Sequence, residues 1–310
     1  MIEVIALDGS HKRIGERFGE IHKKFCRENN LPIFRHPSNE TVRLAKKIEK
    51  FIKNVHPLLL DEIEGISIST GIAYEIVLSN IVFCGCSSYS TACQAVGLVN
   101  KGRTLLVLNY EPPLINKELI IKVRTYYKLG PDKSYRSIIG SDCYLYPTDG
   151  INEKGLAIVT TKVSNKIKGL GLSPFLMNRI ILDRCKDANE AIELMRKGPH
   201  MMEWNFLIGD QRKIVLIETH PPSRILLKEV DKFLVLGNFF WSKPISSKLR
   251  RAILLEEKLK KLNNVDINSI IETMKDREVF NSEKSFNIAA YDMRAKKALI
   301  CNNKVLFLQL

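Results

Sequence analysis

The sequence lacks the features that define several common classes of protein. It has no apolar run close to the roughly 20 residues that span a bilayer, so we expect no membrane span. It has no nucleic-acid-binding motif, which argues against a nucleic-acid partner. No linker, internal repeat or low-complexity tract divides the chain, and we expect one domain over residues 1–310. The first residues lack a basic segment followed by an apolar core, so we expect no secretory leader and a cytoplasmic location.

Cysteine is scarce, and its seven copies are an odd number. In a long chain without a secretory leader, an odd count argues against a disulfide framework. Cys84-Gly85-Cys86 has residue types that bind metals, but no second pair of cysteines or histidines at zinc spacing accompanies it. Gly169-Leu170-Gly171-Leu172 lacks the third glycine and the strand–turn–helix setting of a dinucleotide fingerprint. We therefore expect neither a bound metal nor a cofactor.

Acidic residues are the minority, because 34 Asp and Glu stand against 48 Lys and Arg, which gives a net charge of +14. Almost all of the excess lies after residue 92. A basic field can attract nucleic acid or an anionic small molecule such as a phosphorylated cofactor. Since no nucleic-acid motif accompanies the charge, two interpretations stay open. One is a solvated Lys-rich surface, and the other is the attraction of an anionic small molecule.

Apolar periodicity predicts helices through most of the first 90 residues. The first of them starts after Gly9-Ser10 and contains Gly15 and Gly19. Because glycine inside a helix costs stability, these two predict close packing on a neighbouring element. After residue 110 the pattern turns to strands, with the first four expected at Leu119–Tyr127, Tyr135–Ile139, Cys143–Tyr146 and Leu156–Val163. Two successive helices, further strands and a helix pair follow, and this pattern alone supports a mixed α/β or α+β domain.

A β-hairpin with reactive groups at its ends is the clearest local signal. Residues 93–99 suit a strand, Asn100-Lys101-Gly102 is a turn signal, and residues 103–110 form a nearly continuous apolar run. Because a hairpin returns on itself, Cys93 and Glu111 are expected to meet. A thiol beside a carboxylate is one part of a nucleophilic site.

This hairpin resembles the start of the catalytic chain in the penicillin-type acyl-CoA acyltransferases, a family of self-cleaving N-terminal-nucleophile hydrolases similar to peptidase family C45. In that family a cysteine opens a hairpin that closes on an Asn-aromatic-Asp triplet. Here the triplet is Asn109-Tyr110-Glu111, and Cys93 lies sixteen positions before Asn109. Glu111 in place of Asp, and Gln94 in place of Thr or Ser, depart from the family pattern. Gly85-Cys86-Ser87-Ser88 also looks like a family cleavage site, so Cys86 is the alternative nucleophile.

The resemblance extends over nearly the whole chain and implies roles for individual residues. It implies that Cys93 is the nucleophile and that Glu111 holds the α-amine that cleavage would free. Asn205 lies in an otherwise apolar strand, so its amide is either part of a structural network or a functional donor. Its place before Glu218 and Pro221 matches the family's oxyanion donor. Ser247 to Arg250 matches a Ser-x-x-Arg motif whose Arg lowers the thiol pKa, with Arg251 as the alternative. Tyr110 and Asn238, from Gly237-Asn238-Phe239-Phe240, would bind substrate.

The resemblance also implies the fold and the activity. The fold would be the α+β, four-layer αββα sandwich of the N-terminal-nucleophile hydrolases. Residues 1–92 would be a helical pro-segment or small chain and residues 93–310 the catalytic chain, so the cleaved protein would be a heterodimer of its own two chains. The activity would be a self-processing cysteine amidohydrolase that cleaves a linear, non-peptide amide through an acyl-enzyme. An acyl-CoA-dependent N-acyltransferase and a non-catalytic relative that has lost processing are the alternatives. The substrate would be a small acyl amide or thioester, with acyl-CoA as one option.

Overall fold

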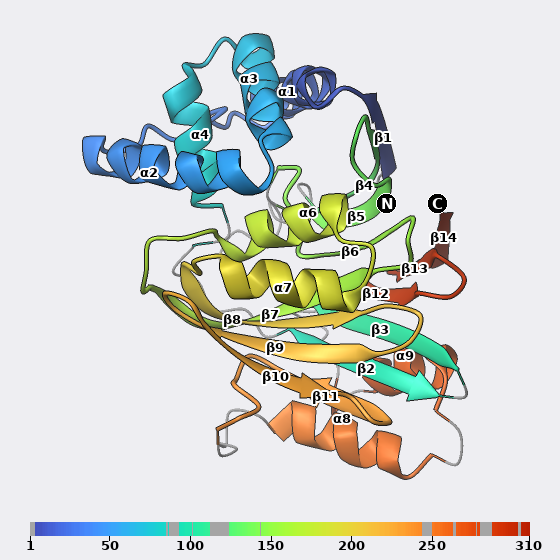
Figure 1. Ribbon diagram of the computed structural model, residues 1–310. Helices are drawn as coiled ribbons and strands as arrows, with labels where there is room; N and C mark the ends of the chain where they lie inside the picture. Colours follow the sequence, from blue (N-terminus) through green and yellow to red (C-terminus); the bar gives the residue numbers. More distant parts are fainter. Residues whose placement is uncertain are drawn as a thin grey trace.

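Two β-sheets lie face to face in the computed structural model, with helices over both outer faces (Figure 1). This is the four-layer αββα sandwich that the resemblance predicts. The structure describes residues 4–310 except 85, 87–92, 101, 112–123, 143, 244–249, 263–264, 277, 280–286 and 303–304. Within that part of the chain, no helix has both the length and the hydropathy needed to cross a bilayer.

The helices fall into an N-terminal group, a pair that covers the larger sheet and a pair that covers the smaller one (Figure 1). They are α1 (His11–Glu28), α2 (Asn39–Val55), α3 (Leu58–Thr70), α4 (Tyr74–Val82), α6 (Pro174–Arg184), α7 (Ala188–Lys197), α8 (Arg250–Lys260) and α9 (Ile267–Lys275). Side chains of Ser10, Ser38 and Asp187 accept hydrogen bonds from the first turns of α1, α2 and α7. These caps satisfy backbone N–H groups that have no partner inside a helix, so they fix where the helices begin.

The larger sheet has the order β1–β4–β5–β6–β7–β8–β9–β10 and the smaller β11–β2–β3–β12–β13–β14. The strands of the larger sheet are β1 (Val4–Gly9), β4 (Thr125–Pro131), β5 (Ser137–Ser141), β6 (Asp149–Asn152), β7 (Ala157–Ile167), β8 (Met202–Gly209), β9 (Ile214–His220) and β10 (Arg224–Glu229). Those of the smaller sheet are β2 (Gln94–Asn100), β3 (Arg103–Tyr110), β11 (Phe233–Leu236), β12 (Asn287–Asp292), β13 (Lys297–Cys301) and β14 (Val305–Gln309). β2 and β3 are neighbours inside their sheet, so the predicted hairpin is confirmed.

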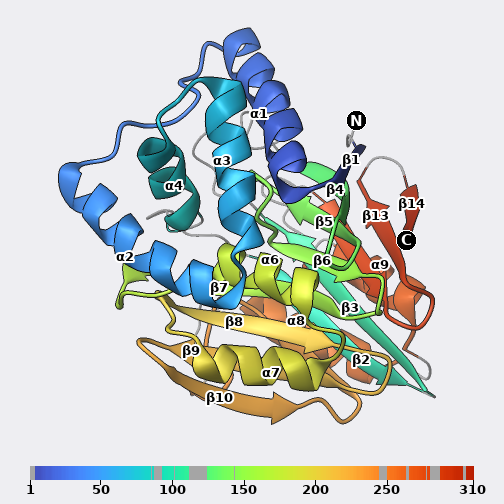
Figure 2. The same ribbon diagram turned by 45° about the horizontal axis from the view of Figure 1, so that its top comes forward.

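Helices α1 and α3 cross in close contact (Figure 2). A Cβ on Gly15 would lie 2.0 Å from the carbonyl oxygen of Glu62, and one on Gly65 would lie 2.1 Å from that of Lys12. On Gly19 it would lie 2.0 Å from a serine hydroxyl of α3. Because any side chain would collide there, the close packing predicted from the two glycines of the first helix is confirmed.

Alternate side chains of each strand point to opposite faces of the sheet and pack in different layers of the core. On β8 and β9, Leu207 and Leu216 pack between the two sheets, whereas Phe206 packs toward α6, α7 and the N-terminal helices. Cys93 and Tyr110 belong to the core between the sheets. A third core joins the other face of the smaller sheet to α8 and α9. The predicted nucleophile therefore lies in the layer between the sheets.

One of the four strands expected after residue 110 is wrong. Within Cys143–Tyr146, the described residues 144–146 form a turn, and Tyr144 has a positive φ of 57°. The strand of this region is β6, which starts at Asp149. A backbone with positive φ cannot continue a strand, so the apolar side chains of this segment are buried by a turn instead. The first expected strand, Leu119–Tyr127, is described only from residue 124, and β4 begins at Thr125.

Candidate active site

Cys93 lies at the start of the first hairpin strand. In the antiparallel register of β2 and β3, Gln94 lies opposite Asn109, so Cys93 reaches the chain at the end of β3. The backbone N–H of Glu111 donates toward the Cys93 sulfur, with 3.5 Å between N and Sγ. Only 6% of Cys93 is exposed. The hairpin thus brings Cys93 and Glu111 together as expected.

The Glu111 carboxylate is completely buried and is held by two neighbours. The amide nitrogen of Asn109 donates to Oε1 at 3.0 Å. The two terminal nitrogens of Arg251, on α8, donate to Oε1 at 2.9 Å and to Oε2 at 2.7 Å. This forked pair is the strongest geometry available to an arginine and a carboxylate, and it fixes the plane of the carboxylate beside the thiol.

Arg251 occupies the position that the sequence assigned first to Arg250. The two are neighbours in the first turn of α8, but their side chains leave the helix in different directions. Arg250 is exposed, whereas 27% of the Arg251 side chain is exposed and its guanidinium reaches Glu111. The structure therefore brings the alternative, Arg251, to the site and leaves Arg250 at the surface.

Sequence reasoning missed a buried cation whose charge acts on the thiol. Arg124 is 2% exposed, and its guanidinium carbon lies 4.3 Å from the centre of the Tyr110 ring. It donates to Asp149 at 2.5 Å. Tyr110 in turn donates its hydroxyl hydrogen to the carboxylate of Asp142. The sequence carried only a weak signal, since Arg124 stands in a largely apolar segment that also contains Lys122, and a buried arginine needs a partner.

These groups determine the protonation state of the thiol. Burial raises the pKa of Cys93 to about 12, and the charges of Glu111 and Asp142 act in the same direction. The Glu111 N–H and the Arg124 charge oppose the shift without cancelling it. At neutral pH, Cys93 in the continuous chain is therefore a neutral thiol, which is a poor nucleophile until a base takes its proton.

Asn205 lies on β8 and is completely buried. Its amide nitrogen donates to the Phe239 carbonyl at 2.7 Å and to the Thr161 hydroxyl at 3.1 Å. The Thr161 hydroxyl itself donates to the Gly237 carbonyl at 2.7 Å. Asn205 therefore fixes the segment that follows β11, and its two N–H groups have protein partners in this arrangement.

Asn238 belongs to that same segment. β11 ends with Leu236 opposite Ala95, two residues from Cys93, so residues 237–239 leave the sheet beside the nucleophile. The amide nitrogen of Asn238 donates to the carbonyl of Lys162 at 2.8 Å. The contacts of Asn205 and Asn238 together hold this segment at the same end of the sandwich as Cys93.

Cys86, the alternative nucleophile, lies in a different layer. It packs against the core on the helical side of the larger sheet, and its sulfur is 3.2 Å from that of Met201. Burial raises its pKa to about 12, and the nearby Lys162 lowers it only in part. Cys93 lies beside the Glu111 N–H and the carboxylate that Arg251 holds. Cys86 lies in other surroundings.

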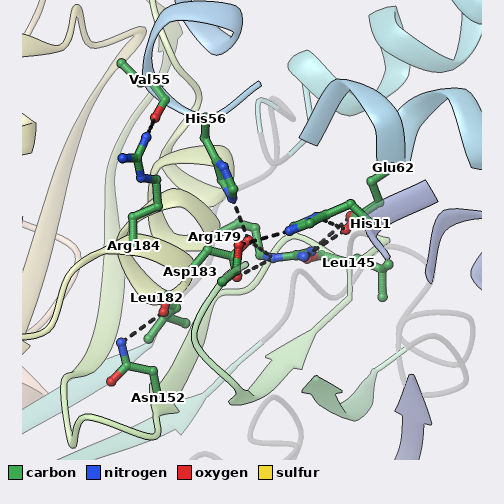
Figure 3. Close-up of polar contacts among 11 residues, drawn as sticks. His11, Val55, His56, Glu62, Leu145, Asn152, Arg179, Leu182, Asp183 and Arg184 are labelled. Carbon is green, nitrogen blue, oxygen red and sulfur yellow. Dashed lines mark hydrogen bonds and ion pairs between the residues drawn. The ribbon is translucent and has the colours of Figure 1, made fainter. Parts of the chain in front are cut away.

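A second polar cluster, which we call the α6 cluster, joins the N-terminal helices to α6 (Figure 3). Arg179 donates from Nε to both oxygens of Asp183 at 2.9 and 3.0 Å, and from its terminal nitrogens to Glu62 at 3.0 and 2.8 Å. His11 contacts Glu62 at 3.2 Å, and His56 contacts Asp183 at 2.9 Å. None of the five is more than 2% exposed.

The α6 cluster fits an ion-pair network better than a metal centre. Ligand atoms of His11, His56 and Asp183 lie within 4.8 Å of one another, and no other group of this kind occurs in the described part of the chain. However, Arg179 holds both oxygens of Asp183, so a metal ion would meet its positive charge. Cys84 is disulfide-bonded, so Cys84-Gly85-Cys86 does not present two free thiols to a metal. The odd number of cysteines therefore did not exclude a single disulfide.

Two sheets packed between helical layers, with a cysteine at the start of an inner strand, define the fold as that of the N-terminal-nucleophile hydrolases. A family model, acyl-coenzyme A:6-aminopenicillanic acid acyl-transferase, matches residues 100–304. The chain belongs to this family.

Solved structures with related folds include the Caenorhabditis elegans ortholog of N-acylethanolamine-hydrolyzing acid amidase. It is 16% identical, with a TM-score of 0.53 over 64% of this chain and 92% of that one. Penicillin V acylase from Agrobacterium tumefaciens is 15% identical, with a TM-score of 0.45 over 70% and 86% of the two chains. Conjugated bile acid hydrolase from Clostridium perfringens is 10% identical, with a TM-score of 0.48 over 70% and 92%. No curated protein matches the sequence.

Proposed function

We propose that the protein is a self-processing cysteine amidohydrolase that cleaves a small, linear acyl amide through an acyl-enzyme on Cys93. The observation that carries the proposal is the chain of contacts from Cys93 to Glu111 to Arg251. It joins a buried thiol to a carboxylate with a fixed orientation, at a strand end where cleavage would free an α-amine. The family membership and the fold support the same class of reaction.

Processing is the first chemical step. The Cys93 thiol attacks the carbonyl of Ala92, and the Ala92–Cys93 C–N bond breaks as its nitrogen takes the thiol proton. Water hydrolyses the resulting thioester and leaves residues 1–92 and a new chain that begins at Cys93. The new α-amine has an ordinary pKa of about 7.7–8.0, so near neutrality it can take the proton of its own thiol. Glu111 then orients the amine through its carboxylate, and Arg251 keeps that carboxylate in place.

Amide cleavage repeats this chemistry on a substrate. The thiolate attacks the acyl carbon, the amine leaves with a proton from the α-ammonium, and water hydrolyses the acyl-enzyme. Asn205 donates an N–H to the oxyanion. The substrate oxygen replaces the 3.1 Å contact of this nitrogen to Thr161, because the Thr161 hydroxyl keeps its bond to Gly237. Tyr110 and Asn238 line the substrate's approach to Cys93.

Self-cleavage is tested by mass spectrometry of the purified protein. We expect two chains, Met1–Ala92 and Cys93–Leu310. The Cys93→Ala variant is expected to stay uncut. Cys86→Ala is the matched control and is expected to cleave normally. An uncut protein that hydrolyses amides, or a new chain that starts at Cys86, would disprove this assignment.

Asn205→Ala is expected to lower kcat by about two decades, the usual effect of removing one oxyanion donor. Asn205→Asp is expected to fail as well, because a carboxylate repels the oxyanion. The measurement is single-turnover acylation by a chromogenic acyl amide, with the urea midpoint recorded for each variant. If Asn205→Ala acylates at the wild-type rate, the amide only fixes residues 237–239.

An acyl-CoA-dependent N-acyltransferase is the second candidate, because the family is named for acyl transfer from coenzyme A and the chain is strongly basic. In that reaction an amine, rather than water, takes the acyl group from Cys93. Turnover of an acyl-CoA with and without an amine acceptor separates the two reactions. Release of CoA that needs the amine favours the transferase, and amide hydrolysis without it favours the hydrolase.

A further inference from the structure

Two buried oxygen acceptors face each other on neighbouring strands near the nucleophile. Asn205 of β8 and Glu218 of β9 lie directly opposite in the antiparallel register. They have the same strand parity as Leu207 and Leu216, so they face the layer between the sheets that also contains Cys93. Asn205 is 0% exposed and Glu218 is 2% exposed.

Neither acceptor is fully satisfied. Glu218 Oε1 accepts the backbone N–H of Ser242 at 3.1 Å, whereas Glu218 Oε2 and Asn205 Oδ1 have no hydrogen-bond partner. In the part of the chain that the structure describes, no Lys, Arg or His forms a salt bridge with Glu218. Burying a carboxylate without a cation costs free energy, so a bound hydrogen-bond donor would stabilise this pair of oxygens.

The pair lies beside the nucleophile. The residues that cover it, from Gly237 to Ser242, bond to Thr161, Asn205 and Glu218. The same segment leaves β11 next to Cys93, since Leu236 pairs with Ala95. The acceptors therefore lie under the same segment that leaves the sheet beside Cys93.

His220, the nearest titratable group on the same strand face, does not supply the missing charge. Its ring lies 4.3 Å from that of Phe240, and its Nε2 has no hydrogen-bond partner. Burial holds the pKa of His220 below its usual value, despite the opposing charges of Glu218 and Glu203. His220 is therefore neutral at neutral pH and is not a cationic partner for Glu218.

We propose that Asn205 Oδ1 and Glu218 Oε2 form a subsite for a cationic amine on the leaving-group side of the substrate. The proposal rests on the proposed function and adds the class of substrate: an acyl amide whose amine part carries a second, protonated amino group. The ammonium brings both a positive charge and several N–H donors, which match one carboxylate and one amide oxygen. Glu218 then acts on specificity alone, whereas Asn205 binds the ammonium through Oδ1 and keeps its proposed N–H contact with the oxyanion.

The test uses two amides with the same acyl chain, one of ethylenediamine and one of propylamine. They differ by an ammonium group in place of a methyl group at the end of the amine part. We expect wild-type protein to prefer the ethylenediamine amide, and the ratio of the two kcat/KM values to fall about tenfold or more in Glu218→Gln, as loss of a charged hydrogen bond requires. An unchanged ratio in Glu218→Gln overturns the proposal, as does a wild-type preference for the propylamine amide.

Glu203→Gln is the matched control. It removes a carboxylate from the same strand pair, but one that already has a cation, because Lys168 lies 2.7 Å from it. Its ratio of kcat/KM values is expected to equal that of the wild type. If the ratio of kcat/KM values fell equally in both variants, the preference would come from the overall electrostatic field of the protein and not from the subsite.

A binding measurement separates this proposal from the proposed function. Calorimetric titration of ethylenediamine is expected to give heat with wild-type and Glu203→Gln protein and none with Glu218→Gln. This result would support the subsite even if no amide were hydrolysed, in which case only the hydrolase assignment fails. Hydrolysis of both amides at equal rates, with no ethylenediamine binding, would keep the hydrolase and overturn the subsite.

Discussion

Arg251→Ala is expected to lower self-cleavage and turnover by about two to four decades. Arg251 forms both charged hydrogen bonds that reach Glu111 from α8, and the Glu111 carboxylate is 0% exposed. Removing one partner of a buried ion pair costs about 3–5 kcal/mol of stability. We expect the transition state, which needs the fixed carboxylate, to lose a similar free energy, and each 1.4 kcal/mol, roughly, is a factor of ten in rate. Without its partner, the carboxylate takes up a proton or moves toward water, so it leaves its place beside the Cys93 thiol before cleavage and cannot orient the proposed α-amine after cleavage.

Arg250→Ala is the control, because it removes the same side chain from the adjacent position. Arg250 is exposed, so its loss is expected to change both rates by no more than about twofold. The measurements are the fraction of cleaved chain over time and the acylation rate of Cys93. Equal losses in the two variants would show that the basic charge of α8, and not the pairing with Glu111, is what matters.

A double variant separates stability from chemistry. Arg251→Met with Glu111→Gln removes both charges, so it is expected to recover most of the stability that either single change costs. It is not expected to recover activity, because a neutral amide cannot pair with the ammonium of Cys93. A double variant that cleaves itself and turns over substrate would show that Glu111 is not part of the site.

The hairpin could be predicted from the sequence because its determinants are local. A turn signal and two apolar runs fix the register of β2 and β3, and the register fixes the approach of Cys93 to Glu111. The choice between Arg250 and Arg251 could not be predicted. Neighbouring helix residues point about 100° apart, and the rotation of α8 about its axis is decided by its packing on the smaller sheet.

Contacts between segments that are distant in the chain could not be predicted from the sequence either. Arg124 directly precedes β4 and Asp149 opens β6, and only the pairing of β4, β5 and β6 brings their side chains together. Glu218 was noted for its place near Pro221, but its position opposite Asn205 depends on the register of β8 and β9. The false strand at Cys143–Tyr146 has the same origin, because apolar residues in a buried turn have the composition of a strand.

The α6 cluster has a consequence for the cleaved protein. His11, His56 and Glu62 belong to residues 1–92, whereas Arg179 and Asp183 belong to residues 93–310. The contacts between Arg179 and Glu62 and between Asp183 and His56 therefore cross the proposed cleavage point. We expect them to keep the two product chains together as a heterodimer after the backbone is cut.

Arg179→Met is expected to lower the free energy of unfolding by about 3–5 kcal/mol, because it removes the cation from two buried carboxylates and leaves their charges uncompensated. Methionine keeps much of the side-chain volume, so the loss measures charge more than packing. Urea unfolding is followed in a Cys93→Ala background, in which the chain is expected to stay uncut. Arg184→Met is the control, since Arg184 lies on the same helix but is exposed and donates to the Val55 carbonyl. It is expected to cost about 1 kcal/mol or less.

The pH dependence of this deficit tests its electrostatic origin. Burial alone would raise the pKa values of Glu62 and Asp183, but the charge of Arg179 and the contacts with His11 and His56 outweigh it and hold both pKa values below their usual range. Carboxyl groups of this kind stabilise the folded state above their ordinary pKa of about 4, and the contribution is lost as the pH falls through the lowered folded-state values. The deficit of Arg179→Met is therefore expected to be full at neutral pH and to shrink in acid below that range. A deficit of the same size at both pH values would assign the loss to packing.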